Sequence, residues 1–260
     1  MKRKALILLL VMLPLLSWGQ GKVYTKKARL QNYASKTTKI VLPDNPMLST
    51  VLQSRMAGCW TLTAFEFCTE KEYESLKENQ GYFFLRFALV GAEGEDGILT
   101  LIFEKGGKAG NQSKEGAFEV VSIPVSASPA GLITAREEAM IPVLVDVIQQ
   151  FTIDASNSDR VAYAGLQFYG TSPVKLRERN VLFCEQDVIQ ETDYPLSSPQ
   201  EIIDAIEARE PGSAISFAVA PFKMIIAADD HRLLWYQKLK STAPAAAGFT
   251  DSEIKTITRR

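Results

Sequence analysis

The sequence predicts an α/β protein in which a mixed β-sheet carries helices on its faces and is built from two similarly ordered halves. Short apolar, β-favouring runs alternate with helical segments that begin at capping residues. The order strand, helix, three-stranded meander and helix occurs twice along the chain. No stretch rich in glycine, proline and serine separates the two halves, so we expect a single compact domain over residues 39–260, with halves of about 39–155 and 156–260.

Residues 1–19 have the layout of a secretory signal peptide. Residues 2–4 are basic, residues 5–16 are apolar, and Ser17-Trp18-Gly19 places small residues at a cleavage site. The apolar run is about a dozen residues long and contains Pro14, whereas a membrane span needs about 20. We therefore expect cleavage after Gly19, a periplasmic or secreted location, and no transmembrane span in the mature chain.

Cleavage after Gly19 leaves Gln20 at the new N-terminus. A small residue followed by Gln resembles the export signals of Bacteroides-type bacteria, and the general layout is similar to uncharacterised exported proteins of such organisms. This resemblance implies export and carries no activity with it. Residues 20–38 contain lysine and arginine but no acidic residue, and we expect a flexible basic segment there because chain ends are usually loosely held.

Charge and cysteine content limit the classes of partner and fold. Cleavage removes three of the 29 basic residues, which leaves 26 against 30 acidic residues and a net charge of −4. This mild acidity argues against nucleic acid as a partner, since nucleic-acid-binding proteins usually carry a basic excess. Cys59, Cys68 and Cys184 are too few, and odd in number, for a disulfide scaffold. They leave two alternatives, buried free thiols or a single bridge.

The first half begins with a short strand in "KIVLP", residues 39–43. Asn45 followed by Pro46 predicts the start of a helix that Gly58 ends. Thr69 and Glu72 have capping-box spacing and predict a second helix, which Gly81 stops. The remaining strands are expected at residues 59–67, 82–90, 98–105 and 117–125.

A long apolar helix is expected between the halves, from Thr134 to Phe151. Thr134 and Glu137 have capping-box spacing. Its apolar positions exceed one face, which predicts burial on most sides and a place at the seam between the halves. Pro142 lies inside it and should kink it. We expect residues 161–170 to continue as helix toward residue 180.

The second half repeats the order of the first. A strand is expected at residues 180–188, followed by a helix with Ser198 as its cap, Pro199 at its first position and Gly212 as its stop. Strands are expected at 213–221, 223–228 and 232–238, and a last helix at 250–258, where Thr250 and Glu253 have capping-box spacing.

One set of residues supports a ligand-binding hypothesis. Glu66 and Cys68 end one expected strand, and Cys184, Glu185 and Asp187 end another. If these strands are parallel neighbours in an open α/β sheet, the residues share its carboxyl edge, where ligands bind. Paired carboxylates there could transfer protons or hold a cation. The alternative is that Glu66 and Glu185 accept backbone N–H groups at the next helix start.

The remaining sequence patterns that resemble functional motifs do not identify a specific reaction. Lys108, in a glycine-rich loop, is not followed by the serine or threonine of a phosphate-binding loop. His231 follows two aspartates in a segment that predicts a turn, so its replacement by alanine should leave folding nearly unchanged. The acidic turn at residues 93–96 lacks the spacing of an EF-hand loop. We therefore expect no catalytic residue, metal site or cofactor.

These observations favour an exported envelope protein with a non-enzymatic binding or assembly role. Tyr82, Phe83, Trp235 and Tyr236 lie on strands that could be sheet edges. An exposed edge can recruit another strand, so we expect an envelope protein partner or self-association.

Two other functions stay open. The first is a periplasmic hydrolase or small-ligand enzyme that uses the carboxylates of Glu66, Glu185 and Asp187 at strand carboxyl ends. The second is a structural module of a larger secretion or surface complex. A cavity lined by those carboxylates would favour the enzyme.

Overall fold

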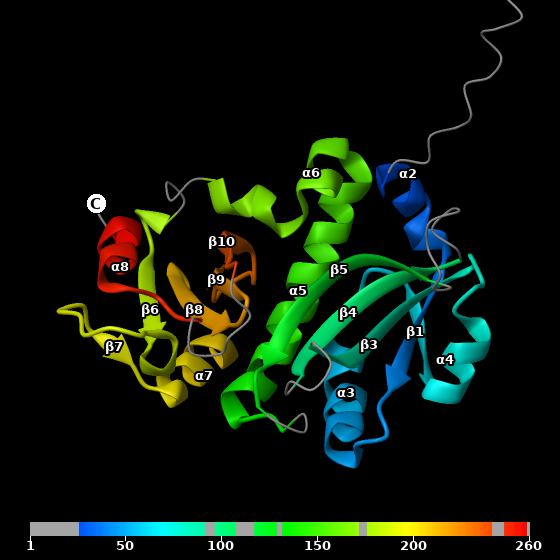
Figure 1. The fold of residues 1–260 in the computed structure, drawn as a ribbon, viewed down its shortest axis with the longest axis horizontal. Coiled ribbons are helices and arrows are strands. Elements are labelled where there is room, and N and C mark those ends of the chain that lie inside the picture. The colour runs from blue at the N-terminus through cyan, green and yellow to red at the C-terminus, as the bar shows by residue number, and fades with distance from the viewer. Residues whose placement is uncertain are drawn as a thin grey trace, which may run out of the picture.

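The computed structural model describes residues 26–91, 97–107, 117–128, 132–171, 176–240 and 247–258. The signal peptide with its cleavage site, residues 20–25, the acidic turn at 93–96 and the loop residue Lys108 lie outside these ranges. No helix within them is long and apolar enough to cross a membrane. The described chain forms two five-stranded mixed sheets, one in each half, with helices on their faces (Figure 1).

The first sheet has the strand order β2-β1-β3-β4-β5. Strand β1 is parallel to both β2 and β3, and β3, β4 and β5 form an antiparallel meander. The elements of this half are α2 (Lys26–Leu30), η2 (Tyr33–Ser35), β1 (Thr37–Leu42), α3 (Pro46–Cys59), β2 (Ala64–Thr69), α4 (Glu70–Leu76), β3 (Tyr82–Val90), β4 (Ile98–Gly106) and β5 (Ala117–Ser126).

The second sheet, read as β7-β6-β8-β9-β10, has the same order and the same strand directions. Its elements are β6 (Asn180–Cys184), η7 (Glu185–Asp187), β7 (Leu196–Ser197), α7 (Pro199–Glu207), β8 (Ser213–Val219), β9 (Phe222–Ala227), β10 (Leu233–Lys238) and α8 (Asp251–Thr258). The predicted α/β class with two similarly ordered halves is therefore confirmed, and each half has a mixed sheet of its own.

The predicted helix starts are confirmed because they depend on local hydrogen bonds. The side chain of Asn45 accepts the N–H groups of Met47 and Leu48 at the start of α3. In each capping box a hydroxyl accepts a backbone N–H three residues on, and the glutamate there accepts the N–H of the cap. The boxes are Thr69–Glu72, Thr134–Glu137, Ser198–Glu201 and Thr250–Glu253.

Two boundaries in the first half differ from the prediction. Helix α3 continues through Gly58 to Cys59, and β2 begins only at Ala64. The intervening segment is held by Gln149 of α5, whose Oε1 accepts the N–H groups of Thr61 and Leu62 at 2.7 and 2.9 Å. These backbone groups therefore bond to a helix and not to a neighbouring strand.

Helix α5 (Ala135–Asn157) lies between the two sheets (Figure 1). It runs through Pro142 as one element. The main core cluster contains residues of α5 together with residues of β3, β4, α7, β8 and β9, so both halves share one interior. The predicted apolar stripe is buried, with at most 2% of each side chain exposed: Ile141, Leu144, Val145, Ile148 and Phe151.

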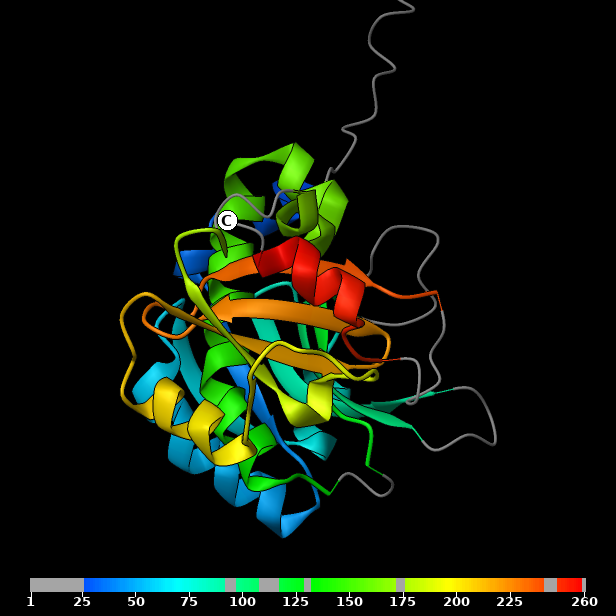
Figure 2. The ribbon, with the colours of Figure 1, turned by 90° about the vertical axis from the view of Figure 1, so that its left-hand side faces the viewer.

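The helices divide the sheet faces in the same way in both halves. The helix between the second and third strands covers one face, and the helix after the fifth strand covers the other. Helix α4 covers the outer face of the first sheet, whereas α5 covers its inner face. In the second half α7 lies on the inner face and α8 covers the outer face, toward the viewer in Figure 2. The halves therefore contact each other through unlike faces: the face covered by the helix after the fifth strand in the first half, and the face covered by the helix between the second and third strands in the second half.

The segment after α5 differs from the predicted continuous helix. Helix α6 (Asp159–Ala164) ends at Gly165, which has a φ of 63°, and η5 (Gly165–Thr171) is a 3-10 helix. At Gly170 the methyl group of an alanine side chain would lie 2.2 Å from the carbonyl oxygen of Tyr236 in β10, so η5 lies directly against that strand. Only glycine permits this approach.

This contact corrects the expectation about exposed aromatic strands. Tyr82 and Phe83 lie on β3, which is an interior strand between β1 and β4. Trp235 and Tyr236 do lie on an edge strand, β10, but η5 packs along it. None of these aromatic residues therefore offers a free strand edge.

The expected flexible segment at residues 20–38 is wrong for residues 26–38. Leu30 is buried in the main core, and β1 begins at Thr37. Lys105 donates a hydrogen bond to the carbonyl of Arg29 at 2.7 Å, and the Arg29 guanidinium lies 4.5 Å from the ring centroid of Phe118. Burial of an apolar side chain and these contacts hold the segment.

The three cysteines are free thiols, which decides between the two predicted alternatives. Cys59 is half-buried, and Cys68 and Cys184 are buried. Burial raises the pKa of the Cys59 thiol to about 12 and that of Cys68 to about 11. Such thiols are poor nucleophiles at neutral pH because the thiolate is the reactive form.

Candidate ligand-binding cleft

The structure separates the predicted ligand-binding residues into two groups. Strand β2, which carries Glu66 and Cys68, lies at the edge of the first sheet and pairs with β1. Strand β6, which ends at Cys184, lies between β7 and β8 in the second sheet. The two strands are not neighbours, so the premise of one shared carboxyl edge is wrong.

Four of the five predicted residues are either exposed on the surface or buried among apolar side chains, and none of the four lines the predicted site. The carboxylate of Glu66 is exposed and pairs with Lys39 of β1 at 2.5 Å, instead of accepting backbone N–H groups. Cys68 is buried under α4, and Cys184 is buried in the main core. Glu185 is exposed at the start of η7.

Asp187 lies in a buried polar cluster. Its Oδ1 accepts hydrogen bonds from Arg136 Nη1 at 3.0 Å and from the N–H of Ala218 at 3.2 Å. Its Oδ2 accepts from Arg136 Nη2 and from the hydroxyl of Ser216, both at 2.5 Å. Four donors thus occupy a carboxylate that is 1% exposed, and no acceptor position is left for a substrate or a cation.

The partner of Asp187 comes from the other half of the molecule. Arg136 lies in the first turn of α5, and its Nη2 also donates to the carbonyl of Ser216 at 2.9 Å. Burial alone would lower the pKa of Arg136, but the nearby Asp187 carboxylate raises it above its ordinary value. The cluster therefore links α5 to β8 as a buried ion pair.

His231 is buried, contrary to the expectation of a dispensable turn residue. Only 4% of it is exposed, it has a φ of 54°, and its Nδ1 lies 2.7 Å from Oδ2 of Asp146 on α5. Oδ1 of Asp146 accepts from Nε2 of Gln149, the residue that holds the segment before β2. The residues before His231 do form the predicted turn, but its imidazole joins the β9–β10 turn to α5.

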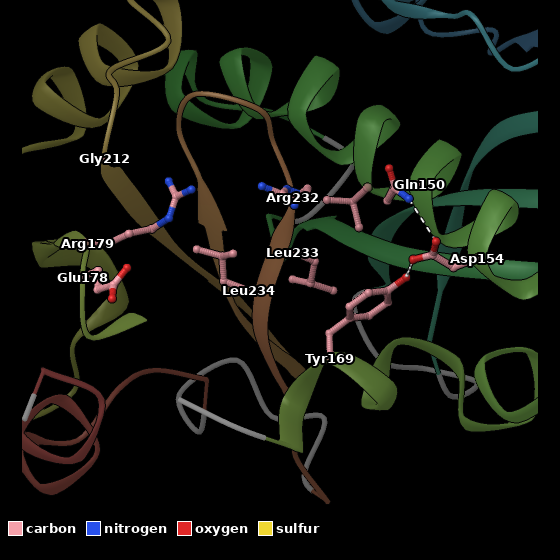
Figure 3. Close-up of a pocket in the computed structure, with 10 residues that line it drawn as sticks. Gln150, Asp154, Tyr169, Glu178, Arg179, Gly212, Arg232, Leu233 and Leu234 are labelled. Carbon is pink, nitrogen blue, oxygen red and sulfur yellow. Dashed lines mark hydrogen bonds between the residues drawn. The ribbon is translucent and has the colours of Figure 1, made fainter. Parts of the chain in front are cut away.

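A cleft of about 660 Å³ lies between α5, η5 and the second sheet (Figure 3). Ligand pockets in proteins usually have volumes of roughly 300–1,000 Å³. The lining residues come from five places in the chain: Val147, Gln150 and Asp154 on α5, Tyr169 on η5, Glu178 and Arg179 before β6, Gly212 before β8, and Arg232, Leu233 and Leu234 at β10.

Two arginines point toward one another across this cleft (Figure 3). Nη1 of Arg179 donates to Oδ1 of Asp229 at 2.9 Å and to the carbonyl of Ser213 at 3.1 Å. Nε of Arg232 donates to Oδ2 of Asp230 at 2.6 Å. The other guanidinium nitrogens have no hydrogen-bond partner in the described part of the chain, so both arginines keep donors for a ligand.

The pKa of Asp229, which accepts a hydrogen bond from Arg179, reflects this contact. Burial alone would raise the pKa of Asp229, but its hydrogen bond with Arg179, the charge of that arginine and nearby backbone N–H groups together lower it below its ordinary value. The Arg179 side chain is only 17% exposed, whereas that of Arg232 is 62% exposed. Arg179 is therefore held by two acceptors in a mostly buried position, whereas Arg232 has one and is largely exposed.

The far end of the cleft carries a carboxylate. Oδ1 of Asp154 accepts from Nε2 of Gln150 at 3.0 Å, and Oδ2 accepts from the hydroxyl of Tyr169 at 2.5 Å. Burial, and then Asp154, raise the pKa of Tyr169 well above its usual range. Both donors to Asp154 are neutral, so they orient its charge without neutralising it.

The cleft lies at an edge of the sheet that the sequence hypothesis did not consider. Arg179, Gly212 and Arg232 directly precede β6, β8 and β10, and these strands run in the same direction. Residues that precede such strands meet at the amino edge of a sheet. The sequence pattern that could have indicated this site is therefore an arginine or a glycine directly before each of these three strands.

Comparison of the chain with known proteins found no matching family model, curated protein or solved structure. Within the described ranges, no group of three or more histidine, cysteine, aspartate or glutamate residues could hold a metal ion. The candidate site therefore depends on the geometry of the cleft alone.

Proposed function

We propose that the mature chain is an exported, non-enzymatic binding protein whose cleft takes a small polar ligand with an acidic group. The observation that supports binding is the pair of arginines that face each other across the cleft with unused donors (Figure 3). Planar guanidinium groups bind carboxylates and phosphates through paired hydrogen bonds. Leu233 and Leu234 at β10 also line the cleft, with 6% and 5% of each residue exposed.

The layout of the first 19 residues supports the exported location. Expression of the full chain with its own leader, followed by N-terminal sequencing of the periplasmic or secreted product, tests this part. We expect a mature chain that begins at Gln20. An uncleaved chain that still begins at Met1 and stays in the cell would overturn the proposal of export.

Calorimetric titration of the mature protein with succinate and with inorganic phosphate tests the binding role. The matched variants are Arg232→Met, which removes one guanidinium from the cleft, and Arg55→Met, which removes an exposed guanidinium on α3 that does not line it. A charged hydrogen bond contributes about 1.5–3 kcal/mol, so we expect Arg232→Met to weaken binding roughly tenfold to 150-fold. Equal weakening by both variants would overturn the proposal, as would a failure of succinate, phosphate and peptides with a free C-terminus all to bind.

The enzyme alternative has less support. It needs the carboxylates of Glu66, Glu185 and Asp187 at one edge, and the strands that carry or precede them lie in different sheets. Asp187 has four hydrogen-bond donors already and cannot act as a free base. We therefore place the function in the cleft at the amino edge.

A further inference from the structure

We infer that the ligand of this cleft is zwitterionic, with separated acidic and cationic groups, as in a short peptide with free termini. This inference rests on the proposed function and specifies its ligand. The acidic group would lie between Arg179 and Arg232, and the cationic group beside Asp154 (Figure 3).

The first argument is the balance of charge around the cleft. Each arginine already has an aspartate partner, Asp229 for Arg179 and Asp230 for Arg232. Glu178 lines the same end and adds a third carboxylate. The formal charges at this end therefore sum to −1, so the site is not positive. A ligand with only negative charge gains less there than a ligand whose own charges balance.

The second argument is the state of Asp154. It receives two hydrogen bonds, both from neutral groups, and no lysine, arginine or histidine within the described ranges forms an ion pair with it. Its carboxylate is held in a fixed orientation on the cleft wall before any ligand arrives. A cationic group of the ligand would supply the missing positive charge, and a prearranged partner binds with less loss of conformational freedom.

The third argument is the spacing of the groups. Arg179 and Asp154 lie at opposite ends of the cleft, with Leu233 and Leu234 between them (Figure 3). A ligand that reaches both ends needs its charges separated by a chain that is at least partly apolar. A tripeptide with a leucine in the middle has this form, whereas the two charges of glycine are adjacent.

Calorimetric titration with related tripeptides tests the inference. The probes are Ala-Leu-Ala with free termini, its N-acetylated form without the cation, and its C-terminal amide without the anion. We expect the free peptide to bind at least tenfold more tightly than either blocked form. Raising the pH through about 8, where an α-amino group loses its proton, should weaken binding of the free peptide but not of the acetylated one.

Variants assign each end of the ligand. Asp154→Asn should remove the preference for the free peptide over the acetylated form, and Arg232→Met should remove the preference over the amide. Asp159→Asn, at an exposed position on α6, is the matched control and should change neither preference.

The outcomes separate this inference from the proposed function. If the acetylated and free peptides bind equally while the amide does not bind, the ligand is simply acidic: the zwitterion is wrong and the proposed function stands. Glycine that binds as tightly as the tripeptide also overturns the inference. If no peptide binds, and succinate and phosphate do not bind either, the proposed function itself fails.

Discussion

Replacing Asp187 by alanine should lower the free energy of unfolding by about 3–5 kcal/mol, because it leaves the buried charge of Arg136 without a counter-ion. Asp187 accepts four hydrogen bonds, two of them from Arg136, and is 1% exposed. The hydroxyl of Ser216 and the N–H of Ala218 lose their acceptor in the same change.

This loss is large compared with the stability of an ordinary protein, which is about 5–15 kcal/mol. A loss of 1 kcal/mol lowers the Tm of a chain of this length by roughly 2–4 °C, so we expect a decrease of about 6–20 °C. Replacing both partners with apolar residues, Arg136→Met with Asp187→Leu, should cost less than Asp187→Ala. No uncompensated buried charge then remains.

Urea unfolding followed by tryptophan fluorescence measures the effect, since Trp60 reports on the first half and Trp235 on the second. Glu185→Ala is the matched control: it removes an exposed carboxylate two residues away and should change stability by less than about 0.5 kcal/mol. A loss below about 1 kcal/mol for Asp187→Ala would refute the reasoning, because removal of one partner alone leaves the charge of the other buried and uncompensated.

Three further predictions concern other contacts. His231→Ala should destabilise the fold by about 1–3 kcal/mol in urea unfolding, because a buried imidazole is removed and the half-buried Asp146 loses one of its two side-chain partners; an unchanged midpoint would contradict this. Gly170→Ala should cost about 1–3 kcal/mol through a clash with β10, while Gly58→Ala, in open space on α3, should leave the thermal midpoint unchanged or raise it. Burial alone would raise the pKa of Glu253, but its hydrogen bond with Lys223 lowers that pKa below its ordinary value. The Glu253 carboxylate therefore stabilises the fold at a pH above its ordinary pKa, and this stabilisation is lost as the pH falls through the pKa of the folded protein. The stability difference between wild type and Glu253→Gln should therefore shrink below about pH 4, and a constant difference would refute the assignment.

The features predicted correctly from sequence are those set by neighbouring residues. Capping boxes such as Thr69–Glu72 and Ser198–Glu201 depend on groups three residues apart, and the strand at residues 82–90 has the predicted bounds. Which strands become neighbours is decided by tertiary packing. The sequence therefore predicted nine of the ten described strands in their order, but it missed the two-residue strand β7 and did not separate the strands into two sheets.

The candidate site was missed for a related reason. Acidic residues at the carboxyl end of β6 led to the prediction of a ligand site at that edge. Arg136 of α5 occupies the position by pairing with Asp187. No local pattern predicts that a residue 51 positions away neutralises a carboxylate. Arg179 and Arg232 lie at one edge of the sheet only because β6, β8 and β10 run in the same direction, and no local pattern predicts that direction.

The stacking of the two halves has a consequence for assembly. Two units related by a two-fold axis join the same surface of each unit and form a closed pair. Here the α5 side of the first half contacts the α7 side of the second half, so unlike surfaces meet. Such a head-to-tail contact leaves a free surface of each kind and is open-ended. Repetition of the same step would add a third unit at either end. Helices α4 and α8 therefore act as end caps, in the manner of the terminal units of repeat proteins, and their removal would expose the apolar sheet faces beneath them.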